Sequence, residues 1–233
     1  MIALITGAGR GLGRAAALEL ARHGWNLALL GRTATQLEET AAQVRNLGRQ
    51  ALTLTAAVED EAAVQKAFAA ITAEFGGLEA LVHCAGTGSF APVAEADAAE
   101  WSRIVQVNLF GMFLCCREAV RIMQPQGRGQ IVNVLSIAAK VTFPGSSAYC
   151  ASKWGGLALT KSLADEVRRE GIRVTALCPG SIETPFWDGI SHGFDPADML
   201  RAEDVAAAIR FVLEQPPGIH TDELVVMPPK GIL

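Results

Sequence analysis

The sequence predicts a doubly wound α/β domain built on a seven-stranded parallel sheet. Short apolar runs alternate with longer amphipathic stretches along the whole chain, as they do where strands and helices follow one another in βαβ units. The chain has 233 residues, a length typical of one domain, and it contains no linker, low-complexity tract or sequence repeat. Half of its residues are hydrophobic and 19% are charged, which supplies a large core and excludes disorder. We therefore expect a single domain over residues 1–233.

In the first half of the chain the pattern predicts four strands with three helices between them. The strands are expected at Ile2–Thr6, Asn26–Leu30, Ala51–Thr55 and Leu78–His83. The helices are expected from Gly11 to about Gly24, at Thr35–Leu47, and from the capping residue Asp60 to Phe75. Apolar residues at helical spacing mark the first helix, and the glycines at 48 and 76 end the second and third.

The second half repeats this alternation. Strands are expected at Gln130–Leu135, Ile172–Cys178 and Leu224–Met227, and helices at about Ala98–Met123, about Ser147–Glu170 and Glu203–Leu213. In an open parallel sheet, ligands bind beyond the carboxyl ends of the strands. The candidates for a site are therefore the residues that follow Ile5, Leu30, Thr55, His83, Leu135 and Cys178.

Composition and charge exclude several classes of protein. The 20 basic and 24 acidic residues give a formal net charge of −4, and no basic cluster offers a nucleic-acid surface. The longest uncharged run, between Glu79 and Glu95, is interrupted by two glycines and a proline and is too short to cross a membrane. The N-terminus lacks the features of a secretory signal, and the five cysteines have no metal-ligand spacing. We expect a cytoplasmic protein with free thiols and without a metal.

A glycine-rich loop follows the first expected strand and leads into the first helix. It reads Thr6-Gly7-Ala8-Gly9-Arg10-Gly11-Leu12-Gly13 and fits the pattern T-G-x-x-x-G-x-G. Glycines allow close approach of a pyrophosphate, and the free N–H groups at a helix start attract its negative charge. A tight turn without a ligand is the other interpretation, but the place of the loop between strand and helix favours a nucleotide.

The end of the second strand indicates which nucleotide is bound. Sites for NAD usually have Asp or Glu there for the ribose 2′-hydroxyl, whereas this chain has Gly31-Arg32-Thr33. The next acid, Glu38, lies inside the following helix. A guanidinium binds a 2′-phosphate that a carboxylate would repel. Arg10 offers a second cation, although a solvated surface charge explains it equally well. We expect NADP(H) to be favoured over NAD(H).

Tyr149 is the single tyrosine of the chain, and Lys153 follows one helical turn later on the same face of the expected helix. A neighbouring ammonium lowers the pKa of a phenol from about 10, which suits general acid–base catalysis. Ser136 follows the fifth strand, where its hydroxyl reaches a carbonyl oxygen, and Asn108 lies in the long helix after the fourth strand. A tyrosine–lysine pair at this spacing also occurs by chance on many helices.

Together these features resemble the short-chain dehydrogenase/reductase (SDR) family of the classical type over essentially the whole chain. The matching residues, in order and at family spacing, are Thr6-Gly7-x-x-x-Gly11-x-Gly13, Asn108, Ser136, Tyr149-x-x-x-Lys153 and Pro179-Gly180-x-Ile182-x-Thr184. The resemblance implies a Rossmann fold that binds a nicotinamide dinucleotide. Within the family the chain looks most like the 3-oxoacyl-(acyl-carrier-protein) reductases.

The resemblance also implies a role for each matching residue. Tyr149 would exchange a proton with the substrate oxygen, and Lys153 would bind the nicotinamide ribose and lower the pKa of Tyr149. Ser136 would orient the carbonyl, and Asn108 would anchor a water for proton relay through Lys153. The residues expected around the cofactor are Gly7, Arg10, Gly11, Leu12, Gly13, Arg32, Val58, Ala85, Gly86, Tyr149, Lys153, Pro179, Gly180, Ile182 and Thr184.

Two segments depart from the family pattern. The family's Asn-Asn-Ala-Gly after the fourth strand is His83-Cys84-Ala85-Gly86 here. We interpret His83 as a structural histidine and Cys84 as a buried thiol. The family's Asp-Val beside the adenine is Ala57-Val58, which leaves one adenine hydrogen bond in question.

These observations predict an NADPH-dependent reductase that converts a ketone or 3-oxoacyl group to a secondary alcohol, with an acyl thioester among the candidate substrates. An NAD-dependent alcohol dehydrogenase of the same family is the first alternative, and Arg32 weighs against it. A non-catalytic dinucleotide sensor is the second, and the retained tyrosine and lysine weigh against it. The segment of about Pro185–Leu200, which holds Phe186, Trp187, Ile190 and Phe194, is expected to form an apolar, mobile lid.

The resemblance further implies a homodimer or homotetramer that pairs through two long helices. Their apolar residues are Phe110, Met112, Phe113 and Leu114 on one helix and Trp154, Leu157 and Leu159 on the other. Packing of the same residues into the core is the alternative explanation. The C-terminal residues 227–233 are expected to pack on a neighbour or to fray. Neither a nucleic acid nor a membrane is expected as a partner.

Overall fold

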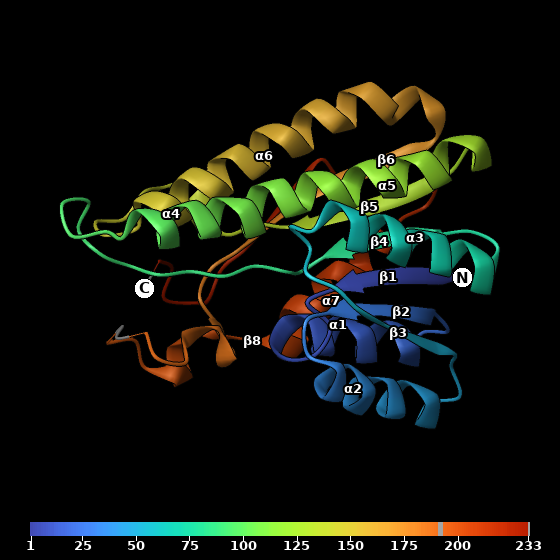
Figure 1. Ribbon diagram of the computed structural model, residues 1–233, viewed down its shortest axis with the longest axis horizontal. Helices are drawn as coiled ribbons and strands as arrows, with labels where there is room; N and C mark the ends of the chain where they lie inside the picture. Colours follow the sequence, from blue (N-terminus) through green and yellow to red (C-terminus); the bar gives the residue numbers. More distant parts are fainter. Residues whose placement is uncertain (191–192, 233) are drawn as a thin grey trace.

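The computed structural model describes residues 1–190 and 193–232 and has the expected doubly wound architecture (Figure 1). Seven parallel strands form the main sheet in the order β3-β2-β1-β4-β5-β6-β9. Their bounds are β1 Ile2–Thr6, β2 Asn26–Gly31, β3 Ala51–Thr55, β4 Ala80–His83, β5 Gly129–Val134, β6 Ile172–Pro179 and β9 Glu223–Val226. The strand order reverses between β1 and β4, and in such sheets the binding crevice lies at the carboxyl ends of the strands beside this point.

Helices cover both faces of the sheet (Figure 1). One face carries α1 (Gly11–Arg22), α2 (Ala34–Asn46) and α7 (Ala202–Leu213); the other carries α3 (Glu61–Phe75), α4 (Ala98–Val105), α5 (Gly111–Gln126) and α6 (Ser147–Val167). Within β1, Leu4 packs into the core on the α3–α5–α6 side and Ile5 into the core on the α1–α2–α7 side. Successive strand residues point to opposite faces, so a strand buried on both faces is apolar throughout.

Local capping explains where the helices begin and end. The Asp60 carboxylate accepts a hydrogen bond from the N–H of Ala63 at 3.0 Å, which satisfies one free donor at the start of α3. The same helix ends at Gly76, whose φ of +77° is the left-handed conformation that glycine adopts without strain. These positions agree with the sequence expectation, and the remaining predicted ends of strands and helices lie within three residues of those in the structure.

The long helix expected over Ala98–Met123 is not continuous. A π-helical turn, η1 (Gln106–Phe110), separates α4 from α5, and Asn108 lies in it. At the next residue, Gly111, a Cβ atom would lie 2.7 Å from Cγ2 of Val58, so only glycine fits against the segment that follows β3. A π turn is a single local insertion within an α-helical segment, too short to be recognised by residue periodicity over the whole helix.

A second, two-stranded sheet is also absent from the sequence prediction. It pairs β7 (Ile182–Glu183) with β8 (Leu200–Arg201), and each strand is too short to give a periodic signal. Between them lie the single turns η4 (Pro185–Trp187) and η5 (Pro196–Asp198). The small sheet therefore pins both ends of the expected lid, of which residues 191 and 192 lie outside the described residues. Two further single turns, η2 (Ile137–Ala139) and η3 (Arg168–Glu170), follow β5 and α6.

Candidate active site

A cavity of about 710 Å³ opens along the carboxyl ends of the main-sheet strands. Its walls are the segments that follow β1, β2, β3, β4, β5 and β6, as the topology predicts. Every residue predicted to contact the cofactor lines this cleft, and so do Ser136, Tyr149 and Lys153. Asn108 is buried behind the wall.

The glycine loop is packed too closely for side chains. Gly7 and Gly11 have φ values of +67° and +54°. A Cβ atom at Gly13 would overlap the carbonyl oxygen of Gly7, and one at Gly7 would lie 3.0 Å from the amide nitrogen of Ala85. The first turn of α1 begins after Arg10 without a side-chain cap, so its amide groups face the cleft unshielded by a side chain. This cradle fits a dinucleotide pyrophosphate.

Positive charge prevails where the cleft meets the end of β2. Arg32 is exposed, lines the cleft and forms no ion pair within the described part of the chain. The nearest acids on α2 are neutralised: Glu38 pairs with Arg45, and Glu39 lies 2.9 Å from Arg14. Arg10, expected as a second cation, is partly engaged, because its Nη1 lies 3.4 Å from Asp188 in an exposed pair.

Tyr149 and Lys153 extend from one face of α6 into the cleft beside Ser136. The Lys153 Nζ donates a hydrogen bond to the carbonyl oxygen of Val134 at 3.3 Å and lies 5.5 Å from the centroid of the Tyr149 ring. The Ser136 Oγ accepts from the N–H of Ala138 at 3.1 Å, which holds the hydroxyl at the end of β5. The three polar groups therefore converge on one region of the cleft.

Burial governs the titration of this pair. Desolvation raises the pKa of Tyr149 to about 12, although a hydrogen bond with Ser136 opposes the rise. Desolvation lowers the pKa of Lys153 to about 8. The expectation that Lys153 lowers the pKa of Tyr149 is therefore wrong for this structure, because the loss of hydration outweighs an ammonium that is bonded to Val134. Tyr149 is a neutral phenol at neutral pH and holds a proton ready to donate.

Asn108 ties the segment after β4 to the helices. Its Oδ1 accepts from the Thr87 N–H at 2.8 Å, and its Nδ2 donates to the Thr87 carbonyl at 2.8 Å and to Ser152 Oγ at 3.0 Å. A Cβ atom at Gly86 would lie 3.5 Å from Asn108 Oδ1 and 3.8 Å from Lys153 Nζ, so both side chains meet at this glycine. The side chain thus positions the cleft wall.

The two residues after β4 that depart from the family pattern, His83 and Cys84, have different surroundings. His83 is fully buried, and its Nδ1 lies 3.2 Å from Thr6 Oγ1, which also accepts a hydrogen bond from the N–H of Ala85. The structural interpretation of His83 agrees with this geometry. Cys84, expected as a buried thiol, is only partly buried and lines the cleft. Desolvation raises the pKa of its thiol to about 12, so it is not a nucleophile.

Aromatic rings enclose the end of the cleft beside Tyr149. The Tyr149 ring packs against Phe90 and Phe186, with centroids 5.8 and 5.7 Å apart. Trp187 stacks on Phe90 at 6.2 Å and meets Phe194 edge-on at 5.4 Å. Phe90 is a contact that sequence reasoning missed, because it lies in a loop without periodicity or a motif.

The C-terminal segment is a further part of the wall that the sequence did not reveal. Met227 and Ile232 line the cleft of their own chain, and the Lys230 Nζ lies 2.8 Å from the carboxylate of Asp198 in η5. A Cβ atom at Gly180 would lie 2.7 Å from Cδ of Pro228, so the segment packs directly on the turn after β6. The expectation that this segment frays or packs on a neighbour is replaced, for residues 227–232, by packing within the chain.

The two long helices present separate core and surface residues. Met112, Leu114 and Leu157 are buried in the core, whereas the side chains of Phe110, Phe113 and Trp154 are exposed. Trp101 on α4 is exposed as well, although its Nε1 donates to Ser147 Oγ at 3.2 Å. Packing into the core therefore explains Met112, Leu114 and Leu157, whereas Phe110, Phe113 and Trp154 are left exposed by the single chain. Among the described residues, no cluster of side chains is arranged to hold a metal ion, and no helix is long and apolar enough to span a bilayer.

Comparisons with known proteins agree with this geometry. Residues 1–193 match the family model described as short chain dehydrogenase. The sepiapterin reductase of Chlorobaculum tepidum is 33% identical over 99% of this chain and 97% of its own. A 3-ketoacyl-ACP reductase from Sinorhizobium meliloti superposes with a TM-score of 0.89 at 37% identity, covering 97% of both chains. An alcohol dehydrogenase from Thermococcus sibiricus, complexed with 5-hydroxy-NADP, superposes with a TM-score of 0.90 at 28% identity, covering 97% of this chain and 95% of its own.

Proposed function

The chain belongs to the short-chain dehydrogenase/reductase family, enzymes that act on CH–OH and C=O groups with a nicotinamide cofactor, and we propose that it uses NADPH to reduce a ketone to a secondary alcohol. The observation that carries the proposal is the convergence of Tyr149, Ser136 and Lys153 on a cleft whose far end carries Arg32. The bound cofactor supplies the hydride. The chain supplies the position of the carbonyl and the proton.

Each polar group has one task in this proposal. The Ser136 hydroxyl donates a hydrogen bond to the substrate oxygen and holds it beside Tyr149. The neutral phenol of Tyr149 donates its proton to that oxygen as negative charge develops there. Lys153 binds the ribose hydroxyls of the nicotinamide half and replaces the proton of Tyr149. Asn108 holds the backbone of Thr87 and so keeps the wall at Gly86 beside Lys153. A water anchored by Asn108 remains part of the proposed proton relay.

The charge around β2 supports NADPH over NADH. Arg32 lacks an ion-pair partner among the described residues, and both nearby acids of α2 are bound to other arginines. A 2′-phosphate brought to this corner meets the guanidinium of Arg32, and the carboxylates of Glu38 and Glu39 are already paired with arginines. The NADP analogue bound by the Thermococcus relative is in keeping with this preference.

The aromatic enclosure favours an apolar ketone. Phe90, Phe186, Trp187 and Phe194 surround the approach to Tyr149, and Ile232 lines the same cleft. Burying an apolar group there gains about 25 cal/mol per Å² of surface. A short 3-oxoacyl thioester also fits this description, since the reacting ketone would enter and the thioester would extend outward.

The test is a fluorescence titration of the purified protein with NADPH and NADH, followed by a panel of ketones and 3-oxoacyl thioesters. We expect NADPH to bind at least tenfold more tightly, equivalent to about 1.4 kcal/mol. Arg32→Gln should reduce that ratio, whereas Arg49→Gln, at an exposed arginine before β3, should leave it unchanged. Equal affinity for NADH would overturn the NADPH assignment, and it would make NAD-dependent alcohol oxidation the better description.

We also propose that the chain forms a homodimer or homotetramer through the exposed face of α5 and α6. The side chains of Phe113 on α5 and of Phe110 in the turn before it are exposed, and so is the side chain of Trp154 on α6. Sedimentation of wild type and of Phe113→Glu tests the assignment. A wild-type monomer would overturn it.

A further inference from the structure

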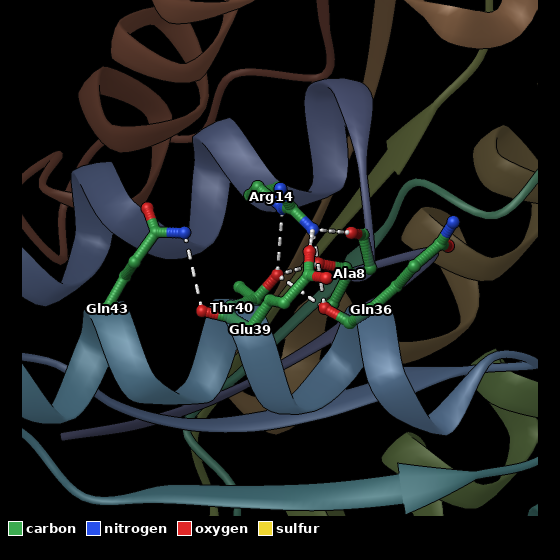
Figure 2. Close-up of polar contacts among 7 residues, drawn as sticks. Ala8, Arg14, Gln36, Glu39, Thr40 and Gln43 are labelled. Carbon is green, nitrogen blue, oxygen red and sulfur yellow. Dashed lines mark hydrogen bonds and ion pairs between the residues drawn. The ribbon is translucent and has the colours of Figure 1, made fainter.

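Arg14 connects the glycine loop to the helix that follows β2, as Figure 2 shows. Its Nη2 donates to the carbonyl oxygen of Gly9 at 2.6 Å and lies 3.4 Å from that of Gln36. The same nitrogen pairs with the Glu39 carboxylate at 2.9 Å, and Nε donates to Thr40 Oγ1 at 3.1 Å. One side chain of α1 therefore holds both the loop before it and the first turns of α2.

Thr40 completes this connection from the other side (Figure 2). The residue is fully buried, and its hydroxyl lies 3.0 Å from the carbonyl oxygen of Ala8 and 3.1 Å from that of Gln36. Arg14 and Thr40 thus fix two consecutive carbonyl groups of the glycine loop against α2. The loop and the helix are also in direct contact, since a Cβ atom at Gly9 would lie 3.0 Å from Cβ of Gln36.

The bond to Gly9 fixes the orientation of the peptide that links Gly9 to Arg10. The C=O and N–H groups of a trans peptide point in opposite directions. Because Arg14 holds the carbonyl of Gly9, the N–H of Arg10 points away from Arg14. Both Gly9 and Arg10 line the cleft, whereas Arg14 is not part of its lining. Arg14 therefore sets the orientation of the Gly9–Arg10 peptide, which lines the cleft, from outside the cleft lining.

The connection also joins the two segments that carry the exposed residues Arg10 and Arg32. Arg10 lies in the loop that Arg14 holds, and Arg32 lies two residues before the first residue of α2. Arg14 itself does not offer a free charge, because Glu39 neutralises it and the loop and α2 use its Nε and Nη2 donors. Its contacts therefore hold the loop and α2 in place and leave few hydrogen-bond donors for a ligand.

We propose that Arg14 is a positioning residue for recognition of the 2′-phosphate: it sets the Gly9–Arg10 peptide and the start of α2 so that Arg10 and Arg32 face one phosphate. The proposal rests on the proposed use of NADPH. It assigns part of the cofactor preference to a side chain that touches neither the phosphate nor the cleft.

The test uses titrations that need neither substrate nor turnover. NADPH, NADH, adenosine 2′,5′-bisphosphate and 5′-AMP are titrated into wild type, Arg14→Met, Arg14→Lys and Thr40→Val. Arg22→Met is the matched control, because Arg22 is an exposed arginine in the last turn of the same helix. Thermal unfolding of each variant shows whether it is folded.

We expect Arg14→Met to weaken NADPH and the 2′,5′-bisphosphate about tenfold, while NADH and 5′-AMP change less than about threefold. Thr40→Val should act in the same direction, and Arg22→Met should behave as wild type. Arg14→Lys should resemble Arg14→Met, because a single ammonium cannot reach the loop and α2 together as a planar guanidinium does.

Three results would overturn the proposal. In the first, a folded Arg14→Met keeps the wild-type ratio of NADPH affinity to NADH affinity. If Arg14→Met does not fold, a wild-type ratio in both Thr40→Val and Arg14→Lys overturns the proposal instead. In the second, NADPH and NADH weaken by the same factor, which would make Arg14 a general support of the pyrophosphate loop. In the third, Arg14→Lys retains the full preference, so that charge alone accounts for the effect. A wild type without preference for NADPH overturns the proposed function as well, and wild-type titrations alone reveal that case.

Discussion

Lys153 Nζ lies 5.5 Å from the centroid of the Tyr149 ring and is hydrogen-bonded to the carbonyl oxygen of Val134, on the β5 side of the cleft. Lys153 is buried and Tyr149 is half-buried where they line the cleft, and desolvation shifts their pKa values in opposite directions, toward about 12 for Tyr149 and about 8 for Lys153. Each shift favours the neutral form of its group. The pair is therefore arranged to keep a proton on the phenol.

Removal of the phenolic proton should separate chemistry from binding. We expect Tyr149→Phe to lower kcat by about 10²- to 10⁴-fold, the usual contribution of a general acid. The ring contacts with Phe90 and Phe186 remain in this variant, so NADPH affinity should change little. Single-turnover kinetics and a fluorescence titration measure the two quantities. Retained turnover would remove Tyr149 from its proposed role.

The lowered pKa of Lys153 predicts a stability that rises with pH. Between about pH 8 and its ordinary value of 10.5, the unfolded chain holds a proton on this lysine that the folded chain has released. Folding stability contributed by this group therefore increases with pH in that window, by at most about 1.4 kcal/mol per pH unit. Lys153→Met should abolish the increase.

Chemical denaturation at several pH values measures this effect as the difference between wild type and Lys153→Met. The difference is needed because burial raises the pKa of Cys84 and Cys116, which gives an opposite slope in the same range. Lys66→Met, at an exposed lysine of α3, is the control. Parallel pH profiles for wild type and Lys153→Met would contradict the prediction.

His83 predicts a loss of stability in acid. Burial lowers the pKa of His83 from 6.5 to about 3, with a smaller effect of the charge on Lys153. As the pH falls from 6.5, the unfolded chain takes up a proton that the folded chain does not, so stability falls by up to about 1.4 kcal/mol per pH unit. His83→Asn should flatten this dependence between pH 6.5 and 4. His23→Asn, at an exposed histidine, should leave it unchanged.

The close packing of the glycine loop predicts a large difference between two alanine substitutions. At Gly13 a Cβ atom would overlap the Gly7 carbonyl, which is backbone and cannot rotate away. We expect Gly13→Ala to lower the free energy of unfolding by about 1–3 kcal/mol or more, as overpacking does. At Gly218 no atom lies within 4 Å of the added methyl group, and φ is not positive. Gly218→Ala should therefore unfold at the wild-type temperature or above.

The C-terminal segment should determine how large a substrate the cleft admits. Ile232 lines the cleft, and the ion pair of Lys230 with Asp198 holds the segment near the lid. We expect Ile232→Ala and Lys230→Glu to raise kcat/KM for bulky ketones relative to small ones, with NADPH affinity unchanged. The charge exchange Lys230→Glu with Asp198→Lys should restore the original preference. An unchanged substrate profile in Ile232→Ala would show that the segment is not a specificity wall.

The sequence determined the architecture and the list of site residues. Apolar alternation located all seven strands of the main sheet, and the strand-end rule pointed to the six segments after β1, β2, β3, β4, β5 and β6 that line the cleft, but not to the C-terminal segment. These features depend on local pattern and turn chemistry, for example the glycines around Arg10 or the cap at Asp60. In the same way, motif spacing predicted Ser136, Tyr149 and Lys153 as site residues.

The tertiary structure alone decided the features that depend on distant contacts. Burial, which no local pattern encodes, reversed the expected pKa shift of Tyr149. Within the π turn, Asn108 is bonded to Thr87 and Ser152, and the segment that holds Ile232 packs on Gly180 and Asp198, all of them residues distant in the sequence. Arg14 belongs to none of the sequence motifs, and only the approach of α2 to the glycine loop gives it a structural role.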